Sequence, residues 1–136
     1  MGYLEQEDVF RDIKRFPESK TFLNTLILRV DASLYFANMA FLEKRLRRGI
    51  ADRPDLRWIV LDLSGVNDMD AVAIETLEGI ISDYQDRHIR FLFAGMKGPI
   101  RDIVARAEWG KKYGESVDYL SIQHALRDIG LMEKDH

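Results

Sequence analysis

The segment "WIVLDLSGVNDMDAVAIETLEGI" (residues 58–80) joins two patterns that together indicate the class of fold. It begins with an almost wholly apolar run, which is typical of a strand buried on both faces of a parallel sheet. From Ala73 onward, apolar side chains recur at helical spacing, opposite glutamates and other polar residues. Three carboxylates, Asp62, Asp68 and Asp70, lie at the junction. The segment therefore predicts a strand, a polar loop and a helix in succession.

The same order recurs on both sides of this segment. "NTLILRV" (24–30) and "IRFLFAG" (89–95) are two further apolar strands, and apolar residues at helical spacing follow each strand. The helix starts are marked by capping or first-turn residues: Asn38, Asp68 or Asp70, Pro99, and Ser121, whose helix stops at Gly130. "DVFRDIKRFPESKT" (8–21) predicts a short strand and a proline turn, and "SVDYL" (116–120) a short extended piece. This alternation predicts an α/β domain with a largely parallel sheet and right-handed crossovers.

Length and composition favour a single ordinary domain. We divide the 136 residues into a flexible segment (1–8), one domain (9–130) and a tail (131–136). A net charge of −3 gives no reason to expect nucleic acid as a partner, and the absence of cysteine excludes disulfides and thiol chemistry. Because neither a signal peptide nor an apolar stretch of roughly 20 residues is found, we expect a cytoplasmic protein.

The three carboxylates have two competing interpretations. Helix caps are far commoner than carboxylate sites, so we favour Asp68 or Asp70 as an N-cap and Asp62 as a residue that binds loop amides. The alternative is a phospho-acceptor site like that of a response-regulator receiver, with Asp62 phosphorylated and Lys97 contacting the phosphoryl group. Such a site also needs an acidic pair after the first strand to hold Mg²⁺, and Asp31 is the single acid there.

No catalytic or metal-binding constellation is found in the sequence. His88, His124 and His136 are scattered, and none has ligand spacing from another. Neither a GxSxG motif nor a phosphate-binding glycine-rich loop is present. We therefore expect a protein that is not an enzyme, with no cofactor and no metal.

The remaining candidates are a lysine–glycine pair at a helix start, two tryptophans and a basic patch. Lys97 and Gly98 at a helix start offer an anion or nucleotide contact. Trp58 and Trp109 are predicted to be packing residues rather than binding anchors. We interpret a basic patch near a helix end as a solvated face whose positive charge complements the negative helix terminus. The alternative is contact with anionic membrane headgroups or with an acidic surface of a partner protein. This patch consists of Lys44, Arg45, Arg47 and Arg48.

Four motifs in a fixed order give the chain a resemblance to a known family. They are "VFRDIKRFPESKT" (9–21), "LILRVDASLYFANMAF" (26–41), the segment 58–80, and "MKGPIRDIV" (96–104). Together they resemble a STAS domain, of the subtype at the C-terminus of SulP (sulfate permease) anion transporters. The resemblance implies an anti-sigma-factor-antagonist-like α/β fold, in which a central mixed, mostly parallel sheet is covered by helices mainly on one side.

The resemblance also implies a regulatory loop that differs from that of free-standing relatives. Bacterial anti-sigma-factor antagonists are switched by phosphorylation of a Ser or Thr that follows an aspartate at a helix start. Asp70 matches the aspartate, but Val72 replaces the usual hydroxyl residue, so we expect no phosphorylation there. The partner-binding or regulatory loop is then assigned to Asn67, Asp68, Met69, Asp70 and Val72.

The preferred function is a non-catalytic, cytoplasmic regulatory and protein-interaction domain of a SulP-type sulfate or anion transporter. Its expected partners are the membrane domain of its own transporter, a soluble regulatory protein or a second copy of the chain, with the membrane only near by. The alternative is a free-standing bacterial anti-sigma-factor antagonist in a partner-switching cascade. A third hypothesis is a nucleotide-binding regulatory module that uses Asn67, Asp68, Lys97 and Gly98.

Overall fold

The sheet is mixed and mostly parallel, as predicted. The computed structural model describes residues 10–12, 24–51, 53–114 and 124–125. Within these ranges the strands lie in the order β1-β2-β3-β4. β1 pairs antiparallel with β2, whereas β2, β3 and β4 run parallel to one another. The strands are β1 (Phe10–Asp12), β2 (Thr25–Val30), β3 (Trp58–Asp62) and β4 (Arg90–Ala94).

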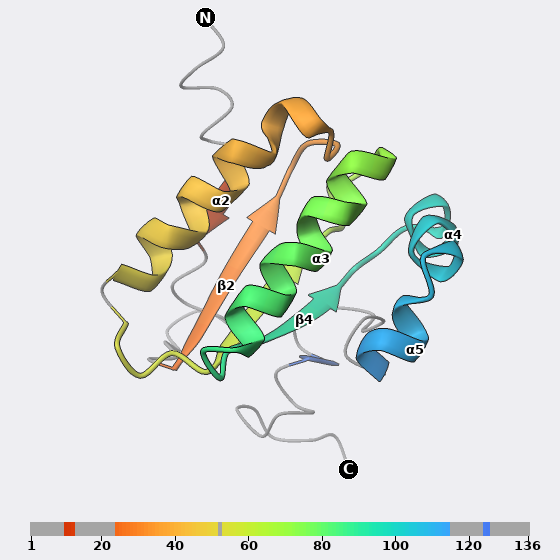
Figure 1. The fold of residues 1–136 in the computed structure, drawn as a ribbon. Helices are drawn as coiled ribbons and strands as arrows, with labels where there is room; N and C mark the ends of the chain where they lie inside the picture. Colours follow the sequence, from red (N-terminus) through yellow and green to blue (C-terminus); the bar gives the residue numbers. More distant parts are fainter. Residues whose placement is uncertain (1–9, 13–23, 52, 115–123, 126–136) are drawn as a thin grey trace, which may run out of the picture.

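Two long helices cover one face of this sheet (Figure 1). α2 (Phe36–Ala51) connects β2 to β3, and α3 (Ala71–Gln85) connects β3 to β4. The stripes predicted from helical spacing are buried against the sheet, with Leu46 of α2 and Leu77 of α3 fully inaccessible. Each crossover therefore returns the chain to the neighbouring parallel strand, which leaves the ends of β2 and β3 beside one another at one edge.

Side chains on both faces of the inner strands are buried. Leu61 of β3 belongs to the core beneath the helices. Val60 and its parallel neighbours Ile27 and Leu92 point to the opposite face, because successive side chains of a strand alternate, and they are 0–2% exposed. Burial on both faces explains why these strands have nearly continuous apolar sequences.

Two shorter helices follow β4. α4 (Gly98–Arg106) begins with the predicted glycine–proline pair, and α5 (Trp109–Tyr113) comes directly after it (Figure 1). Trp109 is fully buried with its ring centroid 5.0 Å from that of Phe93, so its predicted packing role is confirmed. Trp58, which was expected to pack in the same way, is only partly buried. Nothing in the sequence predicted α5, because five residues are too few to establish a helical period.

One predicted cap is wrong and another is confirmed. α2 begins at Phe36, so Asn38 stands inside its first turn and is not the N-cap. From there its side-chain oxygen accepts a hydrogen bond from the backbone N–H of Tyr35 (3.0 Å), which is half of a capping box. Its amide nitrogen donates to the backbone oxygen of Ser33 (2.7 Å). For α3, the N-cap is Asp70, one of the two predicted aspartates.

Some predictions fall on residues that the structure does not describe. They include the flexible segment 1–8, the proline turn, the extended piece 116–120, the tail 131–136 and both ends of the last helix. The predicted short N-terminal strand is observed as β1. In the described part of the chain, no helix has the length and apolar character needed to span a membrane.

Candidate functional site

The loops that follow β2 and β3 are joined to each other by backbone hydrogen bonds. The N–H of Leu34 donates to the backbone oxygen of Asp68 (2.9 Å), and the N–H of Asp70 donates to the backbone oxygen of Leu34 (3.1 Å). These bonds form an isolated parallel bridge between Leu34 and Met69, whose side chains are buried. The first turns of α2 and α3 are therefore fixed side by side at the carboxyl edge of the sheet.

The carboxylate of Asp70 caps both of these helices. Oδ1 accepts a hydrogen bond from the N–H of Ala73 in α3 (2.8 Å), and Oδ2 accepts one from the N–H of Phe36 in α2 (3.1 Å). The first N–H groups of a helix have no partner within the helix and carry partial positive charge. One negative charge between two helix starts therefore satisfies orphan donors on both.

Asp68 orders the aromatic side chain that precedes α2. The hydroxyl of Tyr35 donates to Oδ2 of Asp68 (3.1 Å), across 33 residues of sequence. The other oxygen, Oδ1, accepts from the N–H of Met69 (2.9 Å). Asp68 and Asp70 thus act on the same edge, but each through its own set of hydrogen bonds.

Asp62 lies apart from the other two aspartates in its contacts. It is buried at the end of β3, and its Oδ1 accepts from the N–H of Ser64 (3.0 Å), so its predicted role of binding a loop amide is confirmed. Gly95 after β4 adopts a left-handed conformation (φ 73°), and a Cβ there would lie 2.9 Å from the same oxygen. Asp31, the single acid after β2, is paired with Arg29 (Nε to Oδ1, 3.0 Å).

The edge continues from the β3 loop to the start of α4. Lys97 stands at the N-cap position of α4, and its Nζ donates to the side-chain oxygen of Asn67 (2.6 Å). This bond brings together two of the residues that were predicted to contact an anion or nucleotide. Gly98 is exposed beside them. Among the described residues, no group of three or more histidines and carboxylates is arranged to hold a metal ion.

Three large apolar side chains are exposed on this edge. Tyr35 is 42% exposed, Phe36 69% and Val72 46%, and no other large apolar residue in the described ranges is so exposed. We call these three residues the apolar edge patch. Clustered exposed apolar groups commonly mark protein interaction sites. Of the three, sequence analysis selected Val72 alone; Tyr35 and Phe36 were part of a motif, and only their position at a helix start hinted at exposure.

The basic patch lies toward the other end of α2. Arg48 is in the last turn of a helix that begins at Phe36, about 18 Å away at 1.5 Å per residue. Lys44, Arg47 and Arg48 are exposed, as expected for a solvated face. The structure therefore does not bring these cations together with the aspartates of the carboxyl edge.

The family model of the STAS domain matches residues 16–118. The chain belongs to the STAS domain family. Among curated relatives, the STAS chain is 28% identical to "Probable sulfate transporter 3.5" of Arabidopsis thaliana over 128 residues, covering 93% of the chain and 20% of the transporter. It is 27% identical to "Sulfate transporter 3.2" of the same plant, covering 97% and 22%. The chain thus spans about a fifth of the length of these transporters.

Solved structures show the same fold. The STAS domain of a SulP transporter from Vibrio cholerae superimposes with a TM-score of 0.64 at 23% identity, covering 83% of this chain and 86% of that one. A putative anti-sigma factor antagonist from Thermotoga maritima superimposes with a TM-score of 0.71 at 14% identity, covering 92% and 97%. The predicted family and its anti-sigma-antagonist-like fold are therefore confirmed.

In this STAS domain, Val72 occupies the second position of α3 and its side chain points into solvent. The nearest hydroxyl along the helix belongs to Thr76, and it donates to the backbone oxygen of Val72 (2.8 Å). A hydroxyl engaged by its own helix lies one turn beyond the N-terminal N–H groups that would stabilise a phosphate. Thr76 is therefore poorly placed to carry a phosphate at the start of α3.

Proposed function

We propose that this STAS domain is a non-catalytic regulatory and interaction domain of a SulP-type sulfate or anion transporter, on the cytoplasmic side of the membrane. The curated sulfate transporters that match nearly the whole chain support the transporter class. The observation that best supports an interaction role is the apolar edge patch, which lies on two helix starts held together by hydrogen bonds. Since about four fifths of each relative lies outside the match, the proposed occupant of the patch is the remaining part of its own transporter.

The physical argument rests on Phe36. Its ring is the most exposed of the patch, and its backbone N–H is fixed by Asp70. Fully burying a phenylalanine side chain is worth roughly 1.5–3 kcal/mol. Because the backbone beneath the ring is already ordered by hydrogen bonds, a partner would pay little entropy to bind it.

The first experiment is to sequence the native gene upstream of the Met1 codon. A reading frame that continues in phase into several apolar segments supports the proposal. A stop codon and a ribosome-binding site immediately before Met1 would overturn it. This measurement is independent of how well any variant folds.

In a full-length transporter, Phe36→Ser and Val72→Gln test the patch directly, and glutamine at position 72 adds polarity without a hydroxyl group. We expect lower sulfate uptake or lower surface assembly, while the unfolding midpoint of the isolated domain stays unchanged. Ala105→Ser, at an exposed position of α4, is the matched control and should behave as wild type. Wild-type uptake and assembly in both patch variants would contradict the proposed contact.

Arg48→Glu tests the basic patch in the same assay, and an unchanged uptake would leave it a solvated face.

The alternative function is a free-standing anti-sigma-factor antagonist. The fold that the chain shares with the putative antagonist from Thermotoga maritima is compatible with this function. Val72 argues against a phosphorylation switch at the usual position. Such a protein should bind a purified anti-sigma kinase from its own organism, and the Phe36→Ser variant should bind it more weakly.

The nucleotide hypothesis concerns the other part of the edge. Lys97 would contact a phosphate there, beside Asn67, Asp68 and Gly98. Because Lys97 already donates to Asn67, a nucleotide would have to displace that bond. Calorimetry with ATP and GTP should give saturable heat that Lys97→Ala reduces, whereas a flat titration at millimolar nucleotide would remove the hypothesis.

A further inference from the structure

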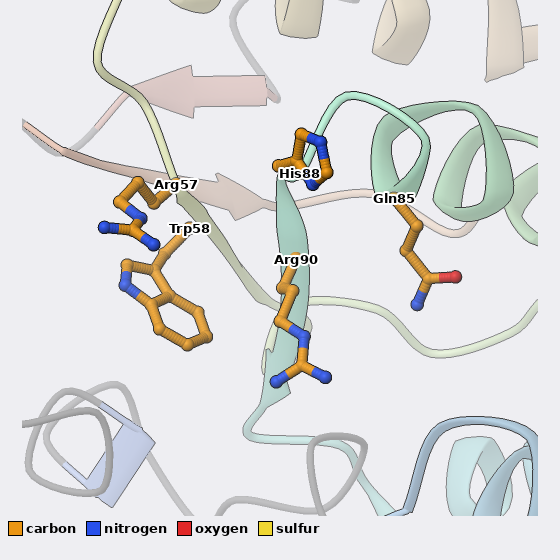
Figure 2. A pocket seen from close by; sticks show the side chains of 5 residues that line it. All are labelled: Arg57, Trp58, Gln85, His88 and Arg90. Carbon is orange, nitrogen blue, oxygen red and sulfur yellow. The ribbon is translucent and has the colours of Figure 1, made fainter.

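A cavity of about 550 Å³ lies near the amino ends of β3 and β4, away from the carboxyl edge (Figure 2). Its lining comes from three parts of the fold: the start of β3 with the residue before it, the start of β4, and the end of α3 with the turn that follows. Figure 2 shows two guanidinium groups, an imidazole, an indole and an amide around it. These belong to Arg57, Arg90, His88, Trp58 and Gln85.

The sheet itself brings the two arginines together. Trp58 and Arg90 are register partners on neighbouring parallel strands, and the backbone N–H of Arg90 donates to the backbone oxygen of Arg57 (2.9 Å). Arg57 directly precedes β3, and its side chain lines the cavity together with that of Arg90. Pairing of β3 with β4 therefore keeps the backbones of these two cationic residues next to each other.

Neither guanidinium group has a counter-ion within the described residues. The side chains of Arg57, Arg90 and His88 make no hydrogen bond or ion pair there, unlike Arg29, which is paired with Asp31. Two uncompensated like charges raise the local positive potential, although the whole chain has a net charge of −3. An anion between them would relieve this repulsion.

Two backbone oxygens at the end of α3 accept hydrogen bonds from the turn that follows the helix. The N–H groups of Arg87 and Ile89 both donate to the backbone oxygen of Tyr84 (2.9 Å each), and the N–H of His88 donates to that of Gln85 (2.9 Å). His88 adopts a left-handed conformation (φ 66°) to make this turn. A non-glycine residue in that conformation is unusual, and here it sets the imidazole on the rim of the cavity.

We infer that this cavity binds an oxyanion of the phosphate or sulfate type, free or as the end group of a larger molecule. Guanidinium groups match such oxyanions with paired N–H donors, and the imidazole and the Gln85 amide supply further donors. A water molecule takes about 30 Å³ in the liquid, so the cavity has room for more than a tetrahedral anion. The indole of Trp58 offers a flat apolar face to the rest of such a ligand.

The two tryptophans of the chain provide a direct test. Trp58 lines the cavity, whereas Trp109 is fully buried in the core beside α5. In ¹H–¹⁵N spectra of the 136-residue chain, sodium phosphate, sodium sulfate and phenyl phosphate are titrated at constant ionic strength. We expect a saturable shift of the Trp58 indole signal while the Trp109 signal stays in place. Trp58→Phe assigns the two signals.

Arginine variants with a matched control make the test specific. Arg57→Gln and Arg90→Gln should weaken binding at least tenfold, whereas Arg106→Gln, at an exposed arginine of α4, should bind as wild type. His88→Gly removes the imidazole but suits the left-handed backbone, so it should weaken binding in a chain that remains folded. An unmoved Trp109 signal verifies folding in every variant.

Vesicles distinguish the source of the anion. Binding to phosphatidylcholine vesicles that contain phosphatidic acid, abolished by Arg57→Gln, identifies a lipid headgroup, and shifts with soluble anions alone identify a free ligand. The inference is overturned if no probe shifts the Trp58 signal saturably and no phosphatidic-acid vesicle is bound, or if Arg57→Gln, Arg90→Gln and Arg106→Gln bind equally. Because the apolar edge patch takes no part, either result is independent of the proposed interaction role.

Discussion

Asp70 accepts a hydrogen bond from the backbone N–H of Phe36, a residue 34 positions earlier in the chain, at 3.1 Å. The other oxygen of the same carboxylate caps its own helix through the N–H of Ala73. One side chain therefore couples the start of α2 to the start of α3. It also fixes the backbone beneath the most exposed apolar ring of the edge, so that stability and partner recognition depend on the same residue.

Removing this carboxylate should destabilise both helix starts. An N-cap side chain is worth about 1 kcal/mol, so Asp70→Ala should lower the free energy of unfolding by about 2 kcal/mol. Asp70→Asn retains one acceptor oxygen and should lose about half of that. Urea unfolding measures both. Asp102→Ala, at an exposed position of α4, is the control and should change stability by less than about 0.5 kcal/mol. Equal midpoints for Asp70→Ala and Asp102→Ala would contradict the double cap.

Two glycine-to-alanine substitutions should have opposite effects. A Cβ at Gly65 would lie 2.6 Å from Oδ1 of Asp31 and 2.7 Å from the backbone oxygen of Val30, where the backbone cannot easily move. Gly65→Ala should therefore lower the free energy of unfolding by roughly 1–3 kcal/mol. Gly79 is exposed within α3 with no atom near its Cβ position, so Gly79→Ala should raise stability by up to about 1 kcal/mol. Thermal unfolding of both variants is the measurement, and changes of the same sign would refute the close approach at Gly65.

Most of the fold was predictable because its main elements follow simple apolar periods. Strands buried on both faces give continuous apolar runs, and α3 presents a clear helical stripe. The position of Asn38 in α2 was predicted wrongly because an asparagine can accept a backbone hydrogen bond at a helix start in two ways. It can do so as the N-cap residue, or as a residue of the first helical turn. Asn38 does so from the third helical residue. Which of these two positions the asparagine occupies depends on the local backbone geometry, and the residue type alone does not determine it.

The candidate site was predictable only in part, because it depends on contacts between distant segments. An aspartate before an apolar helical run indicated the cap at Asp70, but the bond to Phe36 exists only once β2 and β3 are paired. Tyr35 and Phe36 entered the sequence analysis only as part of a motif, so the exposure of Phe36 was not predicted. Arg57 and Arg90 likewise lie far apart in sequence, and their backbones become neighbours only once β3 and β4 are paired.

A second pair of residues, Trp109 and Glu78, fixes α5 to α3. The buried indole N–H of Trp109 donates to Oε2 of Glu78 (3.0 Å), and Nζ of Lys112 donates to the same oxygen (3.0 Å). Glu78→Ala leaves the indole N–H without its acceptor and should cost about 1–3 kcal/mol in urea unfolding. Glu78→Gln keeps an acceptor oxygen and should cost less.

The control for this pair is Glu75→Ala, at an exposed position of the same helix, which should leave the unfolding midpoint nearly unchanged. If Glu78→Ala and Glu78→Gln lost the same stability, the charge of Glu78 rather than its acceptor oxygen would be what matters. If neither differed from Glu75→Ala, the hydrogen bond to Trp109 would contribute nothing measurable.

Alkaline pH should destabilise the domain through Tyr84. Burial raises the pKa of its hydroxyl above the ordinary value of 10.0, and the nearby Arg87 only partly opposes this. The unfolded chain therefore loses the proton first, so stability is fully present below about pH 10 and falls as pH rises through the pKa of the folded state. Tyr84→Phe removes this titration and preserves the ring that lies 5.6 Å from Phe91.

Unfolding free energies at pH 7, 9, 10 and 11 provide the check. Tyr84→Phe should match wild type at pH 7, because the Tyr84 hydroxyl makes no hydrogen bond within the described residues, and it should lose less stability above pH 10. Burial also raises the pKa of Tyr113, so a smaller alkaline loss should remain until Tyr113→Phe is added. Identical alkaline losses in wild type and Tyr84→Phe would mean that burial of this hydroxyl does not control the pH dependence.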